Sequence, residues 1–177
     1  RNTKRYGESG VEMQLSKKQK AILAVAGTAG LAYGVIPTVI GKTRYMTRHD
    51  RSEKTIYLTF DDGPSQYTSD LLDLLAEHDV KATFFMVGTF AAEYPETVRR
   101  VMAEGHQIGV HSLEHRSALI SSPAYTNRDF HDTVAILRNL GADPKYYRPP
   151  WGEGNLWSLM NMDVNGVKKV IWNVMAE

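Results

Sequence analysis

The longest apolar run in the chain lies near its start. Residues 21–41 contain no charged side chain, and lysines and arginines stand on both sides of the run. About 20 apolar residues span the hydrocarbon core of a bilayer, so the run predicts a transmembrane signal anchor. Two alternatives remain open. One is a cleaved signal peptide; the other is a buried helix rich in alanine and glycine, which Pro37 and four glycines disfavour in water.

The anchor prediction divides the chain into four segments. Residues 1–20 are expected to be a cytoplasmic N-terminus, or in part upstream sequence foreign to the natural protein, with Met13 as the natural start. Residues 42–54 are charged and predict a linker, and residues 55–177 predict the folded domain. We therefore expect a single-pass protein of the cell membrane with an extracytoplasmic domain, or a secreted domain after signal cleavage.

Beyond residue 55, strand-like and helix-like patterns alternate. Runs rich in β-branched and aromatic residues predict strands at 55–60, 81–88, 107–112, 146–150 and 167–174. Apolar residues at helical spacing predict helices at 67–78, with Thr68 or Ser69 as cap, and at 95–105, 127–140 and 156–164. This alternation predicts a parallel sheet, either doubly wound or closed into a barrel. Polar clusters at the carboxyl ends of the strands favour the barrel.

Composition narrows the chemistry that this domain can carry. A formal net charge of +1 gives no reason to expect a nucleic-acid partner. The chain contains no cysteine, which excludes disulfides, thiolate nucleophiles and cysteine-based zinc sites. Any metal must therefore be bound by histidine, aspartate or glutamate side chains.

The first candidate motif directly follows the first predicted strand. Asp61 and Asp62 stand side by side and are followed by Gly63 and Pro64. Adjacent carboxylates repel each other unless a cation or a proton relieves them. A metal bound to one carboxylate would leave the other free to act as a base. The alternative is a plain surface turn, because aspartate, glycine and proline are common turn residues.

The second candidate motif is the pair His111 and His115. Two imidazoles at this spacing can bind one metal if the segment is helical or tightly turned, although many such pairs are solvated surface residues. Together with Asp62 they would supply three protein ligands and leave positions open, as a catalytic metal site requires. We interpret the remaining histidines as surface residues, namely His49, His78, His106 and His131.

The third candidate motif is Arg148-Pro149-Pro150-Trp151, at the end of the fourth predicted strand. An arginine there can pair with a carboxylate and keep it ionised. Trp151 offers an apolar face on which a sugar ring could stack. The alternative is a structural salt bridge beside a core tryptophan.

In order, these motifs resemble the first three motifs of the polysaccharide deacetylase family, the NodB-homology domain or carbohydrate esterase family 4. The residues that carry the resemblance are TFDDGP at 59–64, HSLEH at 111–115 and RPPW at 148–151. The resemblance extends from about residue 55 to the end and implies a distorted (β/α) barrel. It implies a bound Zn²⁺, or another divalent ion such as Co²⁺, Ni²⁺ or Mn²⁺. It also implies removal of acetyl groups from N-acetylglucosamine units of a polysaccharide or oligosaccharide, such as peptidoglycan or chitin.

The resemblance also implies a role for each matching residue. Asp61 resembles the catalytic base, and Arg148 resembles the residue that orients this base. Trp151 resembles the aromatic residue whose backbone N–H helps to bind the oxyanion. The implied metal ligands are Asp62, His111 and His115.

Two further motifs of the family are not found in the sequence. Residues 170–177 resemble the approach to an Asp-Trp motif, and no Leu-x-His motif, which carries the usual general acid, follows residue 151. We therefore expect a barrel that is incomplete at its C-terminus. Besides the deacetylase, two alternatives stay open: a non-catalytic glycan- or metal-binding remnant, and a non-haem Fe(II) oxygenase, which also uses two histidines and one carboxylate. The second carboxylate, Asp61, favours hydrolysis.

Overall fold

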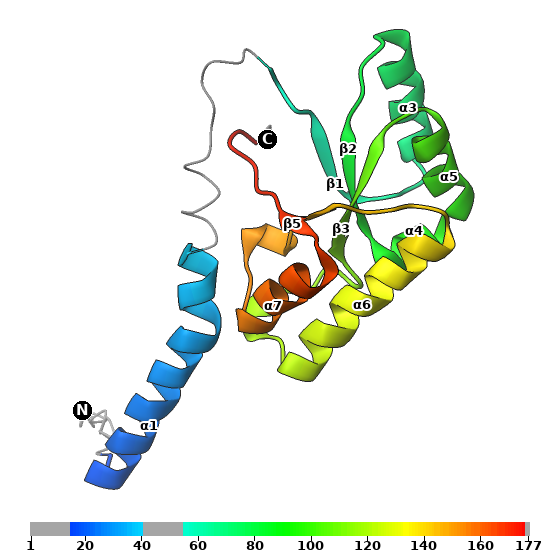
Figure 1. Cartoon of the computed structure of the whole chain (residues 1–177). Coiled ribbons are helices and arrows are strands. Elements are labelled where there is room, and N and C mark those ends of the chain that lie inside the picture. Colours follow the sequence, from blue (N-terminus) through cyan, green and yellow to red (C-terminus); the bar gives the residue numbers. More distant parts are fainter. Residues whose placement is uncertain (1–14, 41–54, 176–177) are drawn as a thin grey trace, which may run out of the picture.

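The computed structural model describes residues 15–40 and 55–175, so the predicted linker at 42–54 and His49 lie outside the described residues. The described part of the chain begins with a helix that stands away from the rest of the molecule over most of its length (Figure 1). It comprises α1 (Lys17–Gly30), the π-helical turn η1 (Leu31–Val35) and helical residues up to Ile40. This helix of 24 residues contains an 18-residue window with a mean hydropathy of 1.7, so it is long and apolar enough to cross a membrane. A signal sequence would meet the same criteria.

The rest of the described chain is built on one parallel sheet of five strands, in which each strand pairs with the next in the sequence. A doubly wound sheet would reverse its strand order at a switch point, whereas sequential order is the winding of a barrel. Among the described residues the sheet stays open between its first and last strands. The strands are β1 (Thr59–Gly63), β2 (Thr83–Val87), β3 (Gln107–Ser112), β4 (Tyr146–Tyr147) and β5 (Lys168–Lys169).

Helices connect the strands and pack against the outer face of the sheet (Figure 1). Two of them begin where the sequence provides a proline at the first helical position, at Pro95 and at Pro123. Ser122 also caps the second of these helices, because its hydroxyl accepts a hydrogen bond from the Tyr125 backbone N–H. The helices are α3 (Thr68–Glu77), α4 (Gly88–Glu93), α5 (Pro95–Ala103), α6 (Pro123–Asn139) and α7 (Leu156–Asn165), with 3₁₀ turns η2 (Ala118–Ile120) and η3 (Pro150–Gly152).

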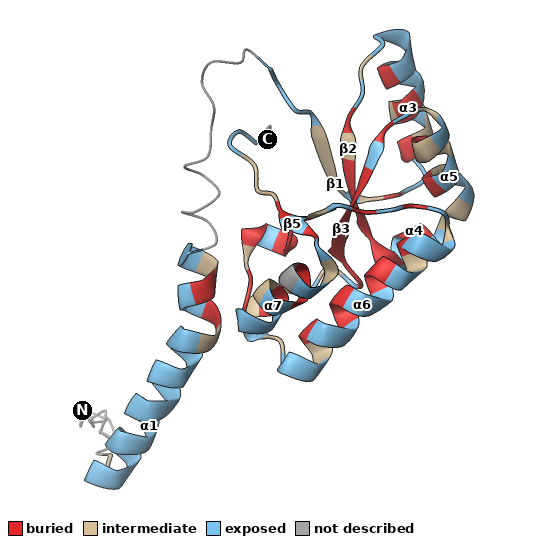
Figure 2. Cartoon of the chain, in the orientation of Figure 1, coloured by how far each residue is buried: buried red, intermediate tan, exposed pale blue. Residues whose placement is uncertain are grey.

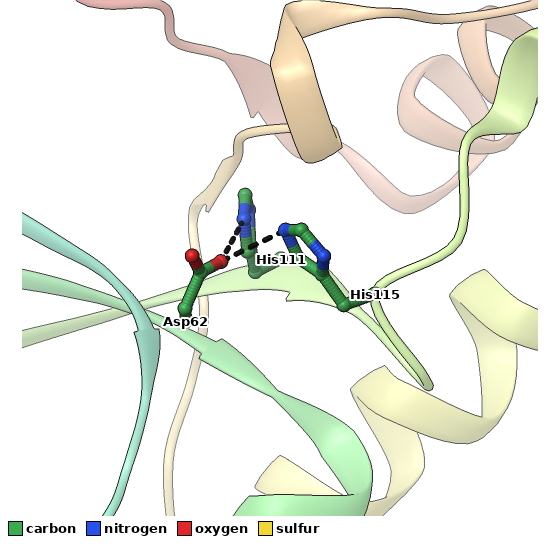
Figure 3. Close-up of side chains that lie close together, drawn as sticks. All are labelled: Asp62, His111 and His115. Atoms are coloured by element: carbon green, nitrogen blue, oxygen red, sulfur yellow. Dashed lines mark ion pairs between the residues drawn. The ribbon is translucent and has the colours of Figure 1, made fainter.

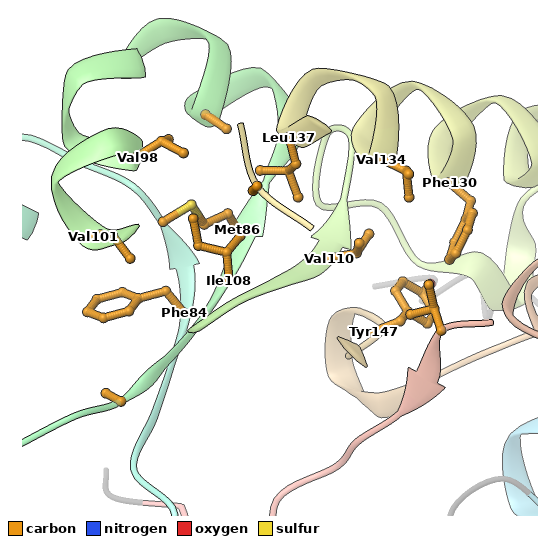
Figure 4. Close-up of a cluster of buried hydrophobic side chains, with 14 of the residues drawn as sticks. Phe84, Met86, Val98, Val101, Ile108, Val110, Phe130, Val134, Leu137 and Tyr147 are labelled. Atoms are coloured by element: carbon orange, nitrogen blue, oxygen red, sulfur yellow. The ribbon is translucent and has the colours of Figure 1, made fainter. Parts of the chain in front are cut away.

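The main hydrophobic core lies between the sheet and these helices (Figures 2 and 4). Side chains alternate across a strand, so one set of strand residues packs against the helices and the next set faces the inner side of the sheet. Phe85 and His111 are buried but belong to this inner set. The outer set and its helical partners include Leu72, Phe84, Met86, Val98, Val101, Ile108, Val110, Phe130, Val134, Leu137 and Tyr147.

Close packing on the inner face depends on the absence of a side chain at Gly109. A Cβ atom there would lie 2.5 Å and 2.6 Å from two ring carbons of Phe85, and 3.2 Å from the Tyr146 carbonyl oxygen. Because Phe85 is buried, we expect Gly109→Ala to lower the free energy of unfolding by about 1–3 kcal/mol, as overpacking usually does. Urea denaturation measures this change.

Gly27→Ala is the matched control, because no other side chain or strand comes within 4 Å of a Cβ at that helical position. Alanine at position 27 is expected to leave the free energy of unfolding of the domain unchanged. An unfolding midpoint for Gly109→Ala equal to that of Gly27→Ala would contradict the packing described here.

Several element boundaries differ from those predicted. The first strand spans Thr59–Gly63 instead of residues 55–60, so it contains both aspartates. The fifth strand is only Lys168–Lys169, and the helix predicted at 127–140 is α6, which begins four residues earlier, at Pro123. The short helix α4 was not predicted, and Thr68 is the first residue of α3 and not its cap. A strand ends where the neighbouring strand no longer provides hydrogen-bond partners, and the local sequence does not encode that position.

The interpretation of His106 as a surface residue is wrong. Its side chain is buried, and Nδ1 accepts a hydrogen bond from the Ala82 backbone N–H at 3.2 Å. The ring also packs edge-on against Phe84. Burial, with a smaller contribution from Lys81, lowers the pKa of His106, so the neutral ring is the favoured form. His106 therefore belongs to the structural core, while His78 and His131 are exposed as predicted.

Candidate metal centre

A buried arginine organises the inner face of the sheet. Arg148 follows β4, and its Nη1 donates hydrogen bonds to Asp61 Oδ1 at 2.7 Å and to Thr59 Oγ1 at 2.8 Å. Its guanidinium carbon lies 4.2 Å from the centroid of the Phe85 ring. Burial lowers the pKa of Arg148 and the Asp61 carboxylate opposes this effect. The result is a fixed cation that holds one oxygen of Asp61 in place.

Asp62 reaches the same site through an irregularity in β1. Between Phe60 and Gly63 the strand advances by three residues while β2 advances by two, which is the signature of a β-bulge. Asp62 occupies the left-handed region with a φ of 65°, a conformation that aspartate adopts more readily than most residues. The bulge breaks the usual alternation of side chains. Two consecutive carboxylates can therefore serve one site.

Asp62, His111 and His115 form a compact cluster of possible metal ligands (Figure 3). The Nε2 atoms of both histidines lie 2.9 Å from Asp62 Oδ1, and the three candidate ligand atoms lie within 4.8 Å of one another. His111 comes from β3 and is 2% exposed, whereas the Asp62 side chain is 63% exposed. The His111 hydrogen bond, aided by the charge of His115, lowers the pKa of Asp62 against the opposing effect of its partial burial.

The contacts of His111 show that either a proton or a metal ion lies between its Nε2 and the Asp62 carboxylate. Its Nδ1 lies 2.5 Å from the Arg148 carbonyl oxygen, which can only accept, so Nδ1 carries the proton. In a neutral ring, Nε2 then presents a lone pair to the Asp62 carboxylate. Two acceptors at this distance require a proton or a metal ion between them. Two imidazole nitrogens and a carboxylate oxygen are a donor set that fits Zn²⁺ or a similar divalent ion.

The loop that carries His115 is held by polar contacts. His115 has a φ of 51°, and its backbone N–H donates to Ser112 Oγ at 2.8 Å. From α6, the buried Asp129 carboxylate accepts a hydrogen bond from the Leu113 backbone N–H at 2.9 Å. Burial raises the pKa of Asp129 to about 6, and the Leu113 hydrogen bond opposes the shift. Asp129 thus holds the loop at Leu113 while its own carboxyl group is largely shielded from water.

The raised pKa of Asp129 predicts a specific dependence of stability on pH. The folded state binds this proton more tightly than the unfolded state, so protonated Asp129 contributes to the free energy of unfolding. This contribution is fully present below pH 3.8 and is lost as the pH rises through about 6. In Asp129→Asn the side-chain amide stays neutral at every pH in this range, so this part of the unfolding free energy is not lost as the pH rises. Between pH 4 and pH 7, we expect the variant to gain about 2–3 kcal/mol of unfolding free energy relative to the wild type.

Urea denaturation of both proteins across this pH range measures the difference. Asp132→Asn is the control, because Asp132 is exposed on the same helix. Parallel pH profiles for the wild type and Asp129→Asn would disprove the raised pKa.

Two cavities flank the cluster. One, of about 550 Å³, extends from His115 and Trp151 along residues 116–122 to Tyr125. The other, of about 350 Å³, extends from Asp61 and Asp62 to Tyr67 and Phe85. Because one cavity borders His115 and the other borders Asp62, an elongated molecule that reaches the candidate ligands could occupy both.

The structure brings together the residues that the sequence singled out. Asp61 pairs with Arg148, and the three predicted ligands converge beside them. Trp151 is half-exposed, with a φ of 54°, and its ring centroid lies 4.5 Å from that of His115, so it is not a core tryptophan. Sequence reasoning missed Asp129, because a helical aspartate is usually solvated, and it missed Thr59, although alternation places Thr59 on the same strand face as Asp61.

A sequentially wound parallel α/β fold with this cluster at the carboxyl ends of its strands is the NodB-type α/β fold. The family described as polysaccharide deacetylase matches residues 48–169, and the chain belongs to this family. A peptidoglycan-N-acetylglucosamine deacetylase of Bacillus cereus is 38% identical over 159 residues, covering 88% of this chain and 58% of the relative. A chitooligosaccharide deacetylase of Bradyrhizobium sp. is 36% identical over 124 residues, covering 68% of this chain and 57% of the relative. The chain thus spans somewhat more than half the length of these two curated relatives.

Solved structures agree with this assignment. A family 4 carbohydrate esterase from Streptomyces lividans, solved in complex with acetate, superposes with a TM-score of 0.65 at 34% identity, covering 67% of this chain and 62% of that one. A family 4 pseudoenzyme from Bacillus anthracis superposes with a TM-score of 0.66 at 22% identity, covering 71% of this chain and 45% of that one. The second likeness concerns the fold alone, and a shared fold does not by itself establish catalysis.

Proposed function

We propose that this protein is a metal-dependent carbohydrate N-deacetylase that hydrolyses the N-acetyl group of N-acetylglucosamine units. The observation that carries the proposal is the pairing of two carboxylates with different partners. Asp62 faces two histidines, while its neighbour Asp61 is held by the buried Arg148. One carboxylate is thereby suited to bind a metal, and the other remains free to accept a proton.

Each residue then has a chemical task. Asp62, His111 and His115 would hold the divalent ion, which when bound supplies a water of pKa about 7 and polarises the acetyl oxygen. Asp61 accepts a proton from the attacking water, and the hydrogen bond from Arg148 fixes the orientation of its carboxylate. The backbone N–H of Trp151 is proposed to donate to the oxyanion. Hydrolysis consumes one water and yields acetate and a free amine on the sugar.

The proposed substrate is a cell-wall or chitin-type polysaccharide. Two cavities border the site, one at His115 and one at Asp62, and together they offer room for more than one sugar unit of a glycan chain. Trp151 at one cavity and the exposed Tyr67 at the other offer aromatic faces for sugar rings. The named activities of the two curated relatives concern peptidoglycan and chito-oligosaccharides.

We further propose that residues 21–41 anchor the protein in the cell membrane and that residues 55–177 form the extracytoplasmic deacetylase domain. The helix from Lys17 to Ile40 is long and apolar enough for this role. Secretion after signal cleavage is the alternative. The anchor would keep the domain close to a cell-wall substrate.

Acetate release from N-acetylated chito-oligosaccharides or purified peptidoglycan, with the zinc-loaded protein, tests the proposal. Acetate equimolar with new amino groups is expected. Stoichiometric zinc binding without acetate release would instead favour the non-catalytic binding domain, which the pseudoenzyme of the same fold makes a concrete alternative. Oxidation of a 2-oxo acid with Fe(II), without acetate, would favour the oxygenase.

A further inference from the structure

The apolar helix has two parts with different surroundings. Residues 16–32 are exposed on all sides, and a Cβ atom at Gly27 or Gly30 would meet nothing within 4 Å. Gly34 and Pro37 are buried, and Tyr33 and Thr38 are half-buried (Figure 2). The change occurs at the π-helical turn η1, where the Ile36 N–H bonds to the Leu31 carbonyl five residues earlier. Such turns interrupt the regular register of a helix and often occur at functional sites.

Polar contacts join the second part to the deacetylase domain. The Tyr33 hydroxyl donates to the Ser121 carbonyl oxygen at 2.8 Å and accepts from Asn155 Nδ2 at 2.9 Å. Thr38 Oγ1 donates to the Gly154 carbonyl oxygen at 2.6 Å and accepts from the Gly154 N–H at 3.0 Å. These bonds join segments more than 80 residues apart in the sequence. Crossing a membrane does not require hydrogen bonds between the helix and the folded domain.

Gly34 permits the close approach. A Cβ atom there would lie 2.6 Å from Leu119 Cδ1 and 3.1 Å from the Leu119 carbonyl oxygen. Leu119 lies in η2, and Ser117 and Ser121, two residues before and after it, line the cavity that begins at His115. The fully buried Asn155 also reaches the Ala118 carbonyl oxygen at 2.6 Å, from the domain side. The helix end therefore packs against the wall of this cavity.

We propose that residues 33–38 are a docking segment that clamps the cavity wall at residues 117–122, so that the membrane anchor and the substrate groove form one rigid unit. This inference rests on the proposed anchoring. Residues 21–32, which remain outside the contact, are about 18 Å long at about 1.5 Å per residue. The hydrocarbon core is about 30 Å thick. The undocked helix is about 12 Å shorter than this core, so the bilayer has to thin around it and the lysines before residue 21 have to extend back to the headgroups. This mismatch draws the docked domain against the lipid headgroups and fixes the height of the groove above the bilayer.

Hydrogen exchange of the full chain in phospholipid vesicles tests the proposal, with amides at 117–122 as the readout. Gly34→Leu should increase their exchange rate at least 10-fold, because leucine cannot fit against Leu119. Gly30→Leu, a turn away on the exposed part of the same helix, should exchange like the wild type. Thr38→Val, which keeps the size but loses both bonds to Gly154, should also speed exchange.

Two results would overturn the proposal. One is equal exchange at 117–122 in Gly34→Leu and Gly30→Leu. The other is a wild-type protein in vesicles that already exchanges as fast as Gly34→Leu, which would mean that insertion across the bilayer pulls the docking segment away. Zinc binding, measured on the same samples, separates this question from the chemistry. Failure to bind zinc would contradict the proposed function while leaving the exchange result intact.

Discussion

His111→Ala is expected to abolish stoichiometric zinc binding, with affinity reduced by well over 100-fold. Losing the support of a ligand already costs 10–100-fold in many metal sites, and this variant removes the ligand itself. His111 is also the most buried of the three candidate ligands, so no water can easily take its place. Equilibrium dialysis against zinc with an indicator of known affinity measures the change.

His131→Ala is the matched control, because His131 is exposed on α6 and lies outside the cluster. It should bind zinc as the wild type does. Retained stoichiometric zinc in His111→Ala would mean that Asp62 and His115 do not hold the ion with His111, and the ligand assignment would have to be abandoned.

Asp61→Asn is expected to retain zinc and to lose acetate release by about 10²–10⁴-fold, the usual contribution of a general base. The amide keeps the size of the carboxylate and can still accept from Arg148, but it cannot take a proton from water. Acetate release from an N-acetylated chito-oligosaccharide, paired with zinc dialysis on the same protein, measures both properties.

Asp70→Asn, at an exposed position of α3, controls for the loss of one negative charge. Loss of zinc in Asp61→Asn would mean that the roles of the two aspartates are the reverse of those proposed. Unchanged acetate release with zinc retained would exclude Asp61 as the base.

The sequence predicted the order of strands and helices well, because amphipathic spacing and proline positions are local signals. It also placed Asp61, Asp62, His111, His115 and Arg148 at the carboxyl ends of the strands, and parallel strands bring these ends together. The family and the α/β fold implied by the motifs are confirmed. The roles of the individual residues stay predictions.

Other features depended on tertiary contacts that no local pattern encodes. The bulge that turns Asp62 toward the histidines exists only in relation to β2. Asp129 and His106 look like ordinary polar residues beside their sequence neighbours, and their burial follows from helix and strand packing. The apolar helix was predicted from its composition, but its contacts with Ser121 and Gly154 lie more than 80 residues away in the chain.

Arg148 joins the two halves of the site through two different parts of one residue. Its side chain holds Asp61, while its backbone carbonyl accepts from His111 and fixes that ring. A designer who grafted only the side chains of this site onto another barrel would therefore lose the orientation of His111. The strand β4 would have to be transplanted with its backbone path, and a scaffold whose fourth strand lies elsewhere would have to be rejected at the outset.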